Sequence, residues 1–117
     1  MADTDIDLLT QRLRRFAGER GWDRIDTPKN LAVAVLVEAA ELQEHFQWLE
    51  KEESFRLSPE RLQAAELEMA DVLIFLLRLA DTLDIDLAAA ARRKIEINAA
   101  KYPADKVSGR AVKYTEL

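Results

Sequence analysis

"SPERLQAAELEMADVLIFLLRLADTL", residues 58–83, joins a helix start signal to the longest run of large apolar side chains in the chain. Ser58 is a candidate N-cap residue, and Pro59 suits the first helical position, where the N–H that proline lacks would be unpaired. The run VLIFLL at residues 72–77 widens the apolar face of this helix to nearly its whole circumference. The stretch therefore predicts a long helix that ends at about Leu83.

A helix that is apolar nearly all round is expected to pack on two sides. One side can face the other helices of the chain. The other side needs a second chain, because large exposed apolar patches are rare on monomers. The sequence therefore predicts a homo-oligomer, with a helical dimer as its smallest form.

Three further helices are expected from start and stop signals, over about residues 5–20, 28–49 and 86–102. Thr4 and Thr27 are candidate N-caps of the first two, and Pro28 again suits the first helical position. Gly21 is expected to end the first helix, and Pro103 the last, because the residue before a proline avoids helical geometry. The residues from about 103 to 117 are expected to form an extended C-terminal tail.

The composition fits one all-helical domain. The 117 residues are 49% hydrophobic and 33% charged, and three glycines and three prolines leave few sites for hairpin turns. A chain of this length can bury one core. We therefore expect a single domain over residues 1–117, of the all-α class, with four helices joined by short connections in a four-helix bundle.

Several classes of function are excluded by the same numbers. Cysteine is absent, which excludes disulfides, thiolate metal sites and a cysteine nucleophile. The net charge of −5 argues against binding a nucleic acid polymer, which needs basic surface. The N-terminus lacks a basic region followed by an apolar one, and the run VLIFLL is too short to span a bilayer. The sequence therefore predicts a cytoplasmic protein without a membrane partner.

Two acidic pairs fall on the apolar faces of neighbouring helices. With about 100° per residue, Glu38 lies within the apolar stripe of the second helix and Glu41 lies about 60° from it. By the same measure Glu68 lies within the stripe of the third helix, with Asp71 about 60° away. Burying a lone carboxylate is costly, and four together repel one another unless cations are present. Solvated pairs of this spacing are common, but two pairs on two apolar faces favour a metal site.

Hard divalent cations are the expected occupants of such a site. Its ligands are carboxylate oxygens, and the chain has no cysteine and one histidine, His45. Oxygen ligands favour Mg²⁺ or Mn²⁺ over Zn²⁺. A di-iron bundle would need Glu-x-x-His on two helices, which a single histidine does not supply.

A polar stripe on the last helix offers groups that bind phosphate oxygens. Asn98 and Lys101 lie within about 40° of Lys94, and Tyr102 lies one step round. Beside a metal cluster these groups would bind phosphate, whereas a solvated basic face near a helix C-terminus also explains them. The aromatic side chains that can stack on a base, or else belong to a core or an interface, are Phe16, Trp22, Phe46 and Trp48.

The chain resembles the MazG-like, all-α nucleoside triphosphate pyrophosphohydrolases, and within them the dCTP pyrophosphatase branch. The family signature, E-x-x-E followed by a spacer and E-x-x-D, reads here Glu38-Ala39-Ala40-Glu41 and Glu68-Met69-Ala70-Asp71. The other matching fragments are FAGERGW at 16–22, PKNL at 28–31, ELQEHFQW at 41–48, EMADVLIFL at 68–76, KIEINAAKYP at 94–103 and KYTEL at 113–117. Each fragment is weak alone, but their order is specific. Members that prefer dCTP often have a histidine just before Pro-x-Asn-Leu, where this chain reads Ile25-Asp26-Thr27, so the base preference stays open.

The resemblance implies Mg²⁺-dependent cleavage between the alpha and beta phosphates of a (deoxy)nucleoside triphosphate, dCTP or a modified dCTP, for nucleotide-pool house-cleaning. The products would be the monophosphate and pyrophosphate. The implied metal ligands are Glu38, Glu41, Glu68 and Asp71, with Glu38 or Glu41 also taking the proton of the attacking water. Our hypothesis for the substrate contacts is that Lys94 and Lys101 hold phosphate oxygens. Trp22, Trp48 and Phe16 would pack around the base, and Asn98 and Tyr102 would lie near the sugar or phosphates. Dimers that pair into tetramers, with sites built from more than one subunit, are implied as well.

Two other functions remain open at this point. A non-catalytic helical dimer that binds a protein or nucleotide partner would show no metal dependence and would tolerate Glu38→Gln or Asp71→Asn. A site of the same design could also cleave another anhydride, such as a nucleotide sugar or a diphosphate.

Overall fold

The computed structural model describes residues 5–117, and no strand occurs among them, which confirms the all-α class. The elements are α1 (Asp5–Glu19), η1 (Trp22–Arg24), α2 (Pro28–Glu44), η2 (Glu53–Phe55), α3 (Pro59–Thr82), α4 (Leu87–Lys101), α5 (Ala104–Val107) and η3 (Tyr114–Glu116). The chain divides into two compact units, one that extends to Asp84 and one that spans Ile85–Leu117. Three of the four helices predicted for the bundle therefore belong to the first unit, and α4 belongs to the second.

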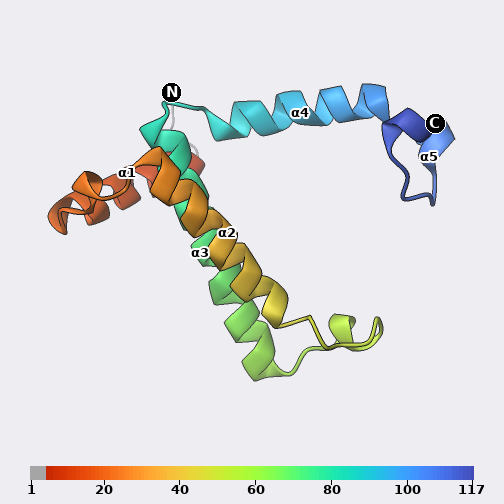
Figure 1. The fold of residues 1–117 in the computed structure, drawn as a ribbon, viewed down its shortest axis with the longest axis horizontal. Helices are drawn as coiled ribbons and strands as arrows, with labels where there is room; N and C mark the ends of the chain where they lie inside the picture. The colour runs from red at the N-terminus through yellow and green to blue at the C-terminus, as the bar shows by residue number, and fades with distance from the viewer. Residues whose placement is uncertain (1–4) are drawn as a thin grey trace. The chain divides into compact units, whose positions relative to one another are not determined.

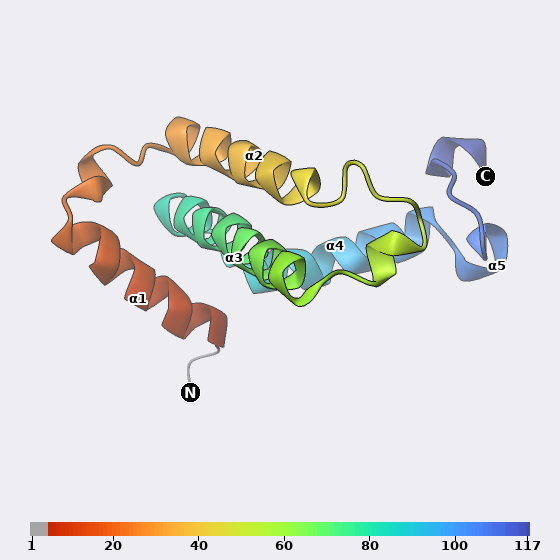
Figure 2. The ribbon, with the colours of Figure 1, turned by 90° about the horizontal axis from the view of Figure 1, so that it is seen from below.

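In the first unit α3 lies between α1 and α2 (Figure 2), and α2 runs along its length (Figure 1). The buried side chains of this unit are Ala17, Leu31, Ala65, Leu77, Ala80 and Arg78. Alanines allow the helices to approach closely, and Leu31 and Leu77 fill the remaining space. The core is therefore small and lies along the contacts of α3 with its two neighbours.

Helix starts are set by side-chain caps, as the sequence predicts. The hydroxyl of Thr27 accepts a hydrogen bond from the backbone N–H of Asn30 at 3.2 Å, and that of Ser58 accepts one from Arg61 at 3.2 Å. At α4 the carboxylate of Asp86 caps the N–H of Ala89 at 3.0 Å. Each cap satisfies an N–H that has no partner within its own helix. The predicted cap Thr4 lies outside the described residues.

The second helix is shorter than predicted, since α2 ends at Glu44 rather than near Leu49. The N–H groups of His45 and Phe46 bond to carbonyls three residues back, at 3.2 and 3.0 Å, so the chain tightens into turns there. The guanidinium of Arg61, from α3, donates to the carbonyl of His45 at 3.3 Å. A partner from another helix thus satisfies a carbonyl at the C-terminal end of α2.

The second unit is also more ordered than the predicted extended tail. Residues 104–107 form α5 and residues 114–116 form η3. The ring of Tyr114 packs edge-on against Tyr102 at 6.1 Å between centroids, and the ammonium of Lys101 lies 4.6 Å from the centre of the Tyr114 ring. These aromatic and cation–π contacts fold the tail back on the end of α4.

Large apolar side chains remain exposed on α2 and α3 in the single chain. Leu36 is 70% exposed and Leu67 is 61% exposed. The full exposed set on these two helices is Val33, Leu36, Val37, Leu62, Leu67, Met69, Leu73 and Ile74. Apolar surface of this extent normally marks an interaction site. No described helix is both long enough and apolar enough to cross a membrane.

Candidate functional site

An acidic cluster forms where α2 and α3 run side by side. Glu38 and Glu41 come from α2 and Glu68 comes from α3, and one carboxylate oxygen of each lies within 4.8 Å of the others. All three side chains are half-buried. The structure therefore brings together three of the four side chains that the sequence predicts as metal ligands. His45 is not a member of this cluster, and within residues 5–117 nothing supports a di-iron arrangement.

Asp71, the fourth predicted ligand, lies beside the cluster rather than within it. Its negative charge acts on Glu38, and its side chain lines a cavity between α1, η1 and α3. Asp71 therefore belongs both to the electrostatic environment of the cluster and to the wall of the cavity.

The cluster lacks the positive charge and hydrogen-bond donors that buried carboxylates need. Within the described part of the chain, one oxygen of Glu38 and one of Glu68 are buried without a hydrogen-bond partner. Burial, a hydrogen bond to Glu41 and the charges of Glu41, Asp71 and Glu68 raise the pKa of Glu38 to about 7. Hard divalent cations are coordinated by carboxylate oxygens of this kind, which lie close together and have no hydrogen-bond partner. The residues present therefore fit a metal ion.

This raised pKa predicts how stability depends on pH in the metal-free protein. The ordinary pKa of the Glu38 carboxyl is 4.5, so between about 4.5 and 7 the unfolded chain releases a proton that the folded chain keeps. The free energy of unfolding should therefore fall as pH rises through this window, and added Mg²⁺ should offset the fall. Chemical denaturation from pH 4.5 to 8, with and without Mg²⁺, measures both effects. Glu38→Gln should lose this component, and an identical pH dependence in that variant would contradict the prediction.

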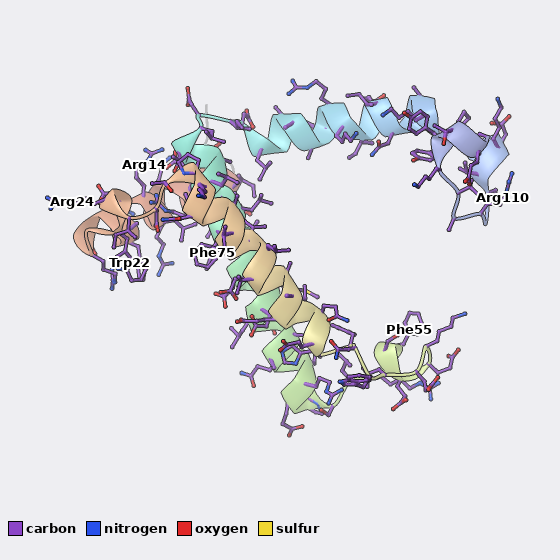
Figure 3. The ribbon with its side chains drawn as sticks, in the orientation of Figure 1. Arg14, Trp22, Arg24, Phe55, Phe75 and Arg110 are labelled. Atoms are coloured by element: carbon purple, nitrogen blue, oxygen red, sulfur yellow. The ribbon has the colours of Figure 1, made fainter. Side chains whose placement is uncertain are left out.

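The cavity beside Asp71 has a volume of about 590 Å³. This volume falls within the roughly 300–1,000 Å³ range of small-molecule sites. Its apolar and aromatic lining consists of Leu9, Leu13, Phe16, Ala17, Trp22, Ala70, Leu73, Ile74, Phe75 and Leu77, and its polar lining of Arg12, Asp26, Asp71 and Arg78. Figure 3 shows Trp22 on η1 and Phe75 on α3. A mostly apolar wall with a few polar groups is the usual design of a site for a small molecule with a flat ring.

Phe16 and Trp22 are held against each other at the cavity. Their rings meet edge to face, with 5.6 Å between centroids, and the Arg20 guanidinium lies 3.6 Å from the centre of the Phe16 ring. Gly21, between α1 and η1, has a φ of 68°, a left-handed conformation that glycine adopts without strain. The loop after η1 is fixed by Asn30, whose amide donates to the carbonyl of Ile25 at 2.9 Å. These contacts set the position of Trp22.

The other predicted substrate contacts come from the loop after α2 and from the second unit. Trp48 is 86% exposed and does not line the cavity. Lys94, Asn98 and Lys101 are exposed on α4, and Tyr102 is half-buried against Tyr114, all in the second unit. The polar stripe that the sequence predicts is thus present on α4, and its contact with a substrate stays a prediction.

The pair of Arg78 and Asp26 in the cavity wall received no role from the sequence. Arg78 is 8% exposed, and Nη2 of its guanidinium lies 3.5 Å from Oδ2 of Asp26. In the sequence, Arg78 is a lone basic residue that directly follows the longest run of large apolar side chains. Position in an apolar helix alone does not tell whether such a residue reaches solvent or is buried.

The fold and site define an all-α protein with a candidate divalent metal centre beside an aromatic cavity. The chain belongs to the MazG-like family, whose model matches residues 33–117.

Curated and structural relatives agree with this family. The chain is 39% identical over 104 residues to dCTP pyrophosphatase 1 of Bos taurus, a match that covers 87% of this chain and 62% of that protein. The corresponding protein of Homo sapiens is 40% identical over 104 residues, with 87% and 61% covered. The chain thus spans about 62% of the length of the curated relatives it matches. The crystal structure of a pyrophosphatase from Archaeoglobus fulgidus is 43% identical, with a TM-score of 0.82, and the match covers 88% of this chain and 96% of that one.

Proposed function

We propose that this protein is a Mg²⁺-dependent nucleoside triphosphate pyrophosphohydrolase that cleaves between the alpha and beta phosphates of dCTP or a modified dCTP. The observation that carries the proposal is the cluster of Glu38, Glu41 and Glu68, with unpaired buried oxygens, beside an aromatic cavity. The relatives named dCTP pyrophosphatase 1 support the substrate class. The role would be house-cleaning of the nucleotide pool, and a cytoplasmic location stays a prediction.

The metal ligands in this proposal are Glu38, Glu41, Glu68 and Asp71. Their all-oxygen donor set favours Mg²⁺, with Mn²⁺ able to replace it. The chemistry that the metal supplies when bound is neutralisation of triphosphate charge and acidification of water. Glu38 or Glu41 accepts a proton from the attacking water, and the pKa of about 7 at Glu38 suits a base that works near neutral pH.

The reaction that these residues support is an in-line displacement. Water attacks the alpha phosphorus, its proton passes to Glu38 or Glu41, and the bond from that phosphorus to the bridging oxygen breaks. The monophosphate forms and pyrophosphate leaves. Phe16 and Trp22 pack around the base in the cavity that they line. Lys94 and Lys101 are proposed to hold phosphate oxygens as point charges, with Trp48 near the base and Asn98 and Tyr102 near the sugar or phosphates.

We also propose a homo-oligomer, a dimer or a dimer of dimers, with sites completed by a second subunit. The exposed apolar side chains on α2 and α3 and the 86% exposure of Trp48 support this assembly. Light scattering coupled to size-exclusion chromatography should give two or four times the 13.3 kDa mass of the chain. A protein that is monomeric at assay concentration and fully active would contradict it.

Incubation with Mg²⁺ and a panel of canonical and modified nucleoside triphosphates tests the proposed reaction, with the products separated by chromatography. Monophosphate and pyrophosphate in equal amounts are expected, with dCTP or a modified dCTP turned over fastest and no turnover after chelation of the metal. Release of orthophosphate would place the cleaved bond elsewhere. Absence of turnover with every triphosphate would reject the activity.

A further inference from the structure

Arg78 is the only charged residue among residues 5–117 that is nine-tenths buried, and it is incompletely paired. Its Nε has no hydrogen-bond partner within the described residues. Its ion pair with Asp26, from Nη2 to Oδ2, is long at 3.5 Å. A guanidinium carries five N–H donors, and burial without partners is costly for each. The site around Arg78 therefore lacks hydrogen-bond acceptors.

The neighbouring ion pair does not supply an acceptor to the Nε of Arg78. Asp81, one turn on from Arg78, is engaged by Arg14 through two hydrogen bonds, Nε to Oδ2 at 3.0 Å and Nη2 to Oδ1 at 2.6 Å. This pairing with Arg14 lowers the pKa of Asp81, and the charge of Arg78 contributes to the same lowering. Asp81 and Arg14 thus join α1 to α3 and leave the Nε of Arg78 unpaired.

Arg78 and Asp26 both line the cavity that also contains Phe16, Trp22 and Asp71. Asp71 and Arg78 are two helical turns apart on α3, a separation of about 10 Å along the helix axis. Arg78 therefore lies on the same cavity wall as Asp71, about 10 Å further along α3. Asp71 in turn lies beside the acidic cluster. A nucleotide with its phosphates at the cluster and its ring packed against Phe16 and Trp22 would have the edge of its base in the cavity that Arg78 and Asp26 also line.

We propose that Asp26 and Arg78 recognise the edge of a cytosine base, Asp26 accepting from the exocyclic amine and Arg78 donating to the ring nitrogen and carbonyl oxygen beside it. Arg78 offers only donors and Asp26 only acceptors, and cytosine presents the complementary groups in adjacent positions. Uracil has a carbonyl oxygen where cytosine has the amine, so it would place an oxygen against the carboxylate. A substituent on carbon 5 of cytosine leaves this hydrogen-bonding edge unchanged, so Asp26 and Arg78 would also bind cytosines modified at that position.

This inference rests on the proposed function, because it assigns the base of the nucleotide to the cavity. It makes Asp26 and Arg78 residues that determine specificity for cytosine over uracil. A purely structural pair, which only ties the loop after η1 to α3, would instead affect all nucleotides alike.

The test compares binding of dCMP and dUMP by isothermal titration calorimetry with the full chain and Mg²⁺, where no turnover occurs. The wild type should bind dCMP at least about tenfold more tightly than dUMP. Asp26→Asn should reduce that ratio by about tenfold, since an amide can turn its N–H₂ group toward the uracil carbonyl. Asp23→Asn, on η1 and outside the cavity lining, is the matched control and should leave the ratio unchanged.

An unchanged ratio in Asp26→Asn, an equal loss for both nucleotides, or a wild type that binds neither or does not discriminate would each overturn the inference. Arg78→Lys provides a second variant, which keeps the charge but has fewer donors, and it should weaken dCMP binding more than dUMP binding. The proposed activity is judged separately by triphosphate turnover. If the protein hydrolyses triphosphates but binds dCMP and dUMP equally, only the inference about Asp26 and Arg78 is rejected. If the wild type prefers dCMP, Asp26→Asn loses that preference, and no triphosphate is hydrolysed, only the proposed activity is rejected.

Discussion

Replacing Glu38 by glutamine should lower kcat for dCTP by at least about 100-fold, the scale expected for loss of a catalytic base. Glutamine keeps the shape of the side chain and removes its negative charge. One of the three carboxylates that meet within 4.8 Å is then lost, together with a proton acceptor whose pKa is about 7. One buried Glu38 oxygen has no hydrogen-bond partner among the described residues, and the amide of glutamine can keep a hydrogen bond to Glu41, so the variant should keep the fold. Pyrophosphate release at saturating dCTP over a series of Mg²⁺ concentrations measures the effect.

Glu44→Gln is the matched control for this variant. Glu44 is the last residue of α2, on the same helix as Glu38, and its side chain is exposed and outside the cluster. Its replacement should leave kcat within about twofold, because its exposed carboxylate lies outside the cluster and is screened by water and salt. A Glu38→Gln enzyme that retains wild-type kcat at every Mg²⁺ concentration would remove Glu38 from the reaction. Equal losses in both variants would indicate a general effect of charge rather than a metal site.

Replacing Leu31 by alanine should lower the free energy of unfolding by about 2–5 kcal/mol, the range seen for large-to-small substitutions in cores. Leu31 is 1% exposed and is one of the two largest fully buried side chains described. The core of the first unit otherwise consists mostly of alanines, which cannot expand into the space that the leucine leaves. The substitution therefore removes apolar burial and creates a cavity. Urea denaturation, followed by circular dichroism at a fixed protein concentration, gives the change in free energy.

Leu8→Ala is the control for the core substitution. Leu8 lies on α1 and is 52% exposed, so the same chemical change should cost less than about 1 kcal/mol. Protein concentration must be equal in both experiments, because the stability of an oligomer depends on it. A cost for Leu31→Ala no larger than that for Leu8→Ala would mean that Leu31 is not part of a packed core in solution.

The sequence alone determined the helices and the faces that carry the acidic pairs. Thr27 and Ser58 cap their helices as predicted, because a cap depends only on residues three positions apart. Glu38, Glu41 and Glu68 meet because helical periodicity places them on the faces that α2 and α3 turn toward each other. Both features follow from short-range geometry, which a pattern of residues along the chain records directly.

Only the tertiary structure decided where α2 ends and what lines the cavity. The end at Glu44 involves Arg61, which reaches back from α3 to the carbonyl of His45. The contact of Asp26 with Arg78 and the position of Asp71 at the cavity wall likewise depend on how the loop after η1 and helix α1 pack on α3. Residues far apart in sequence meet there because of the packing of whole helices, and no local periodicity encodes which side chain a neighbouring helix will bury.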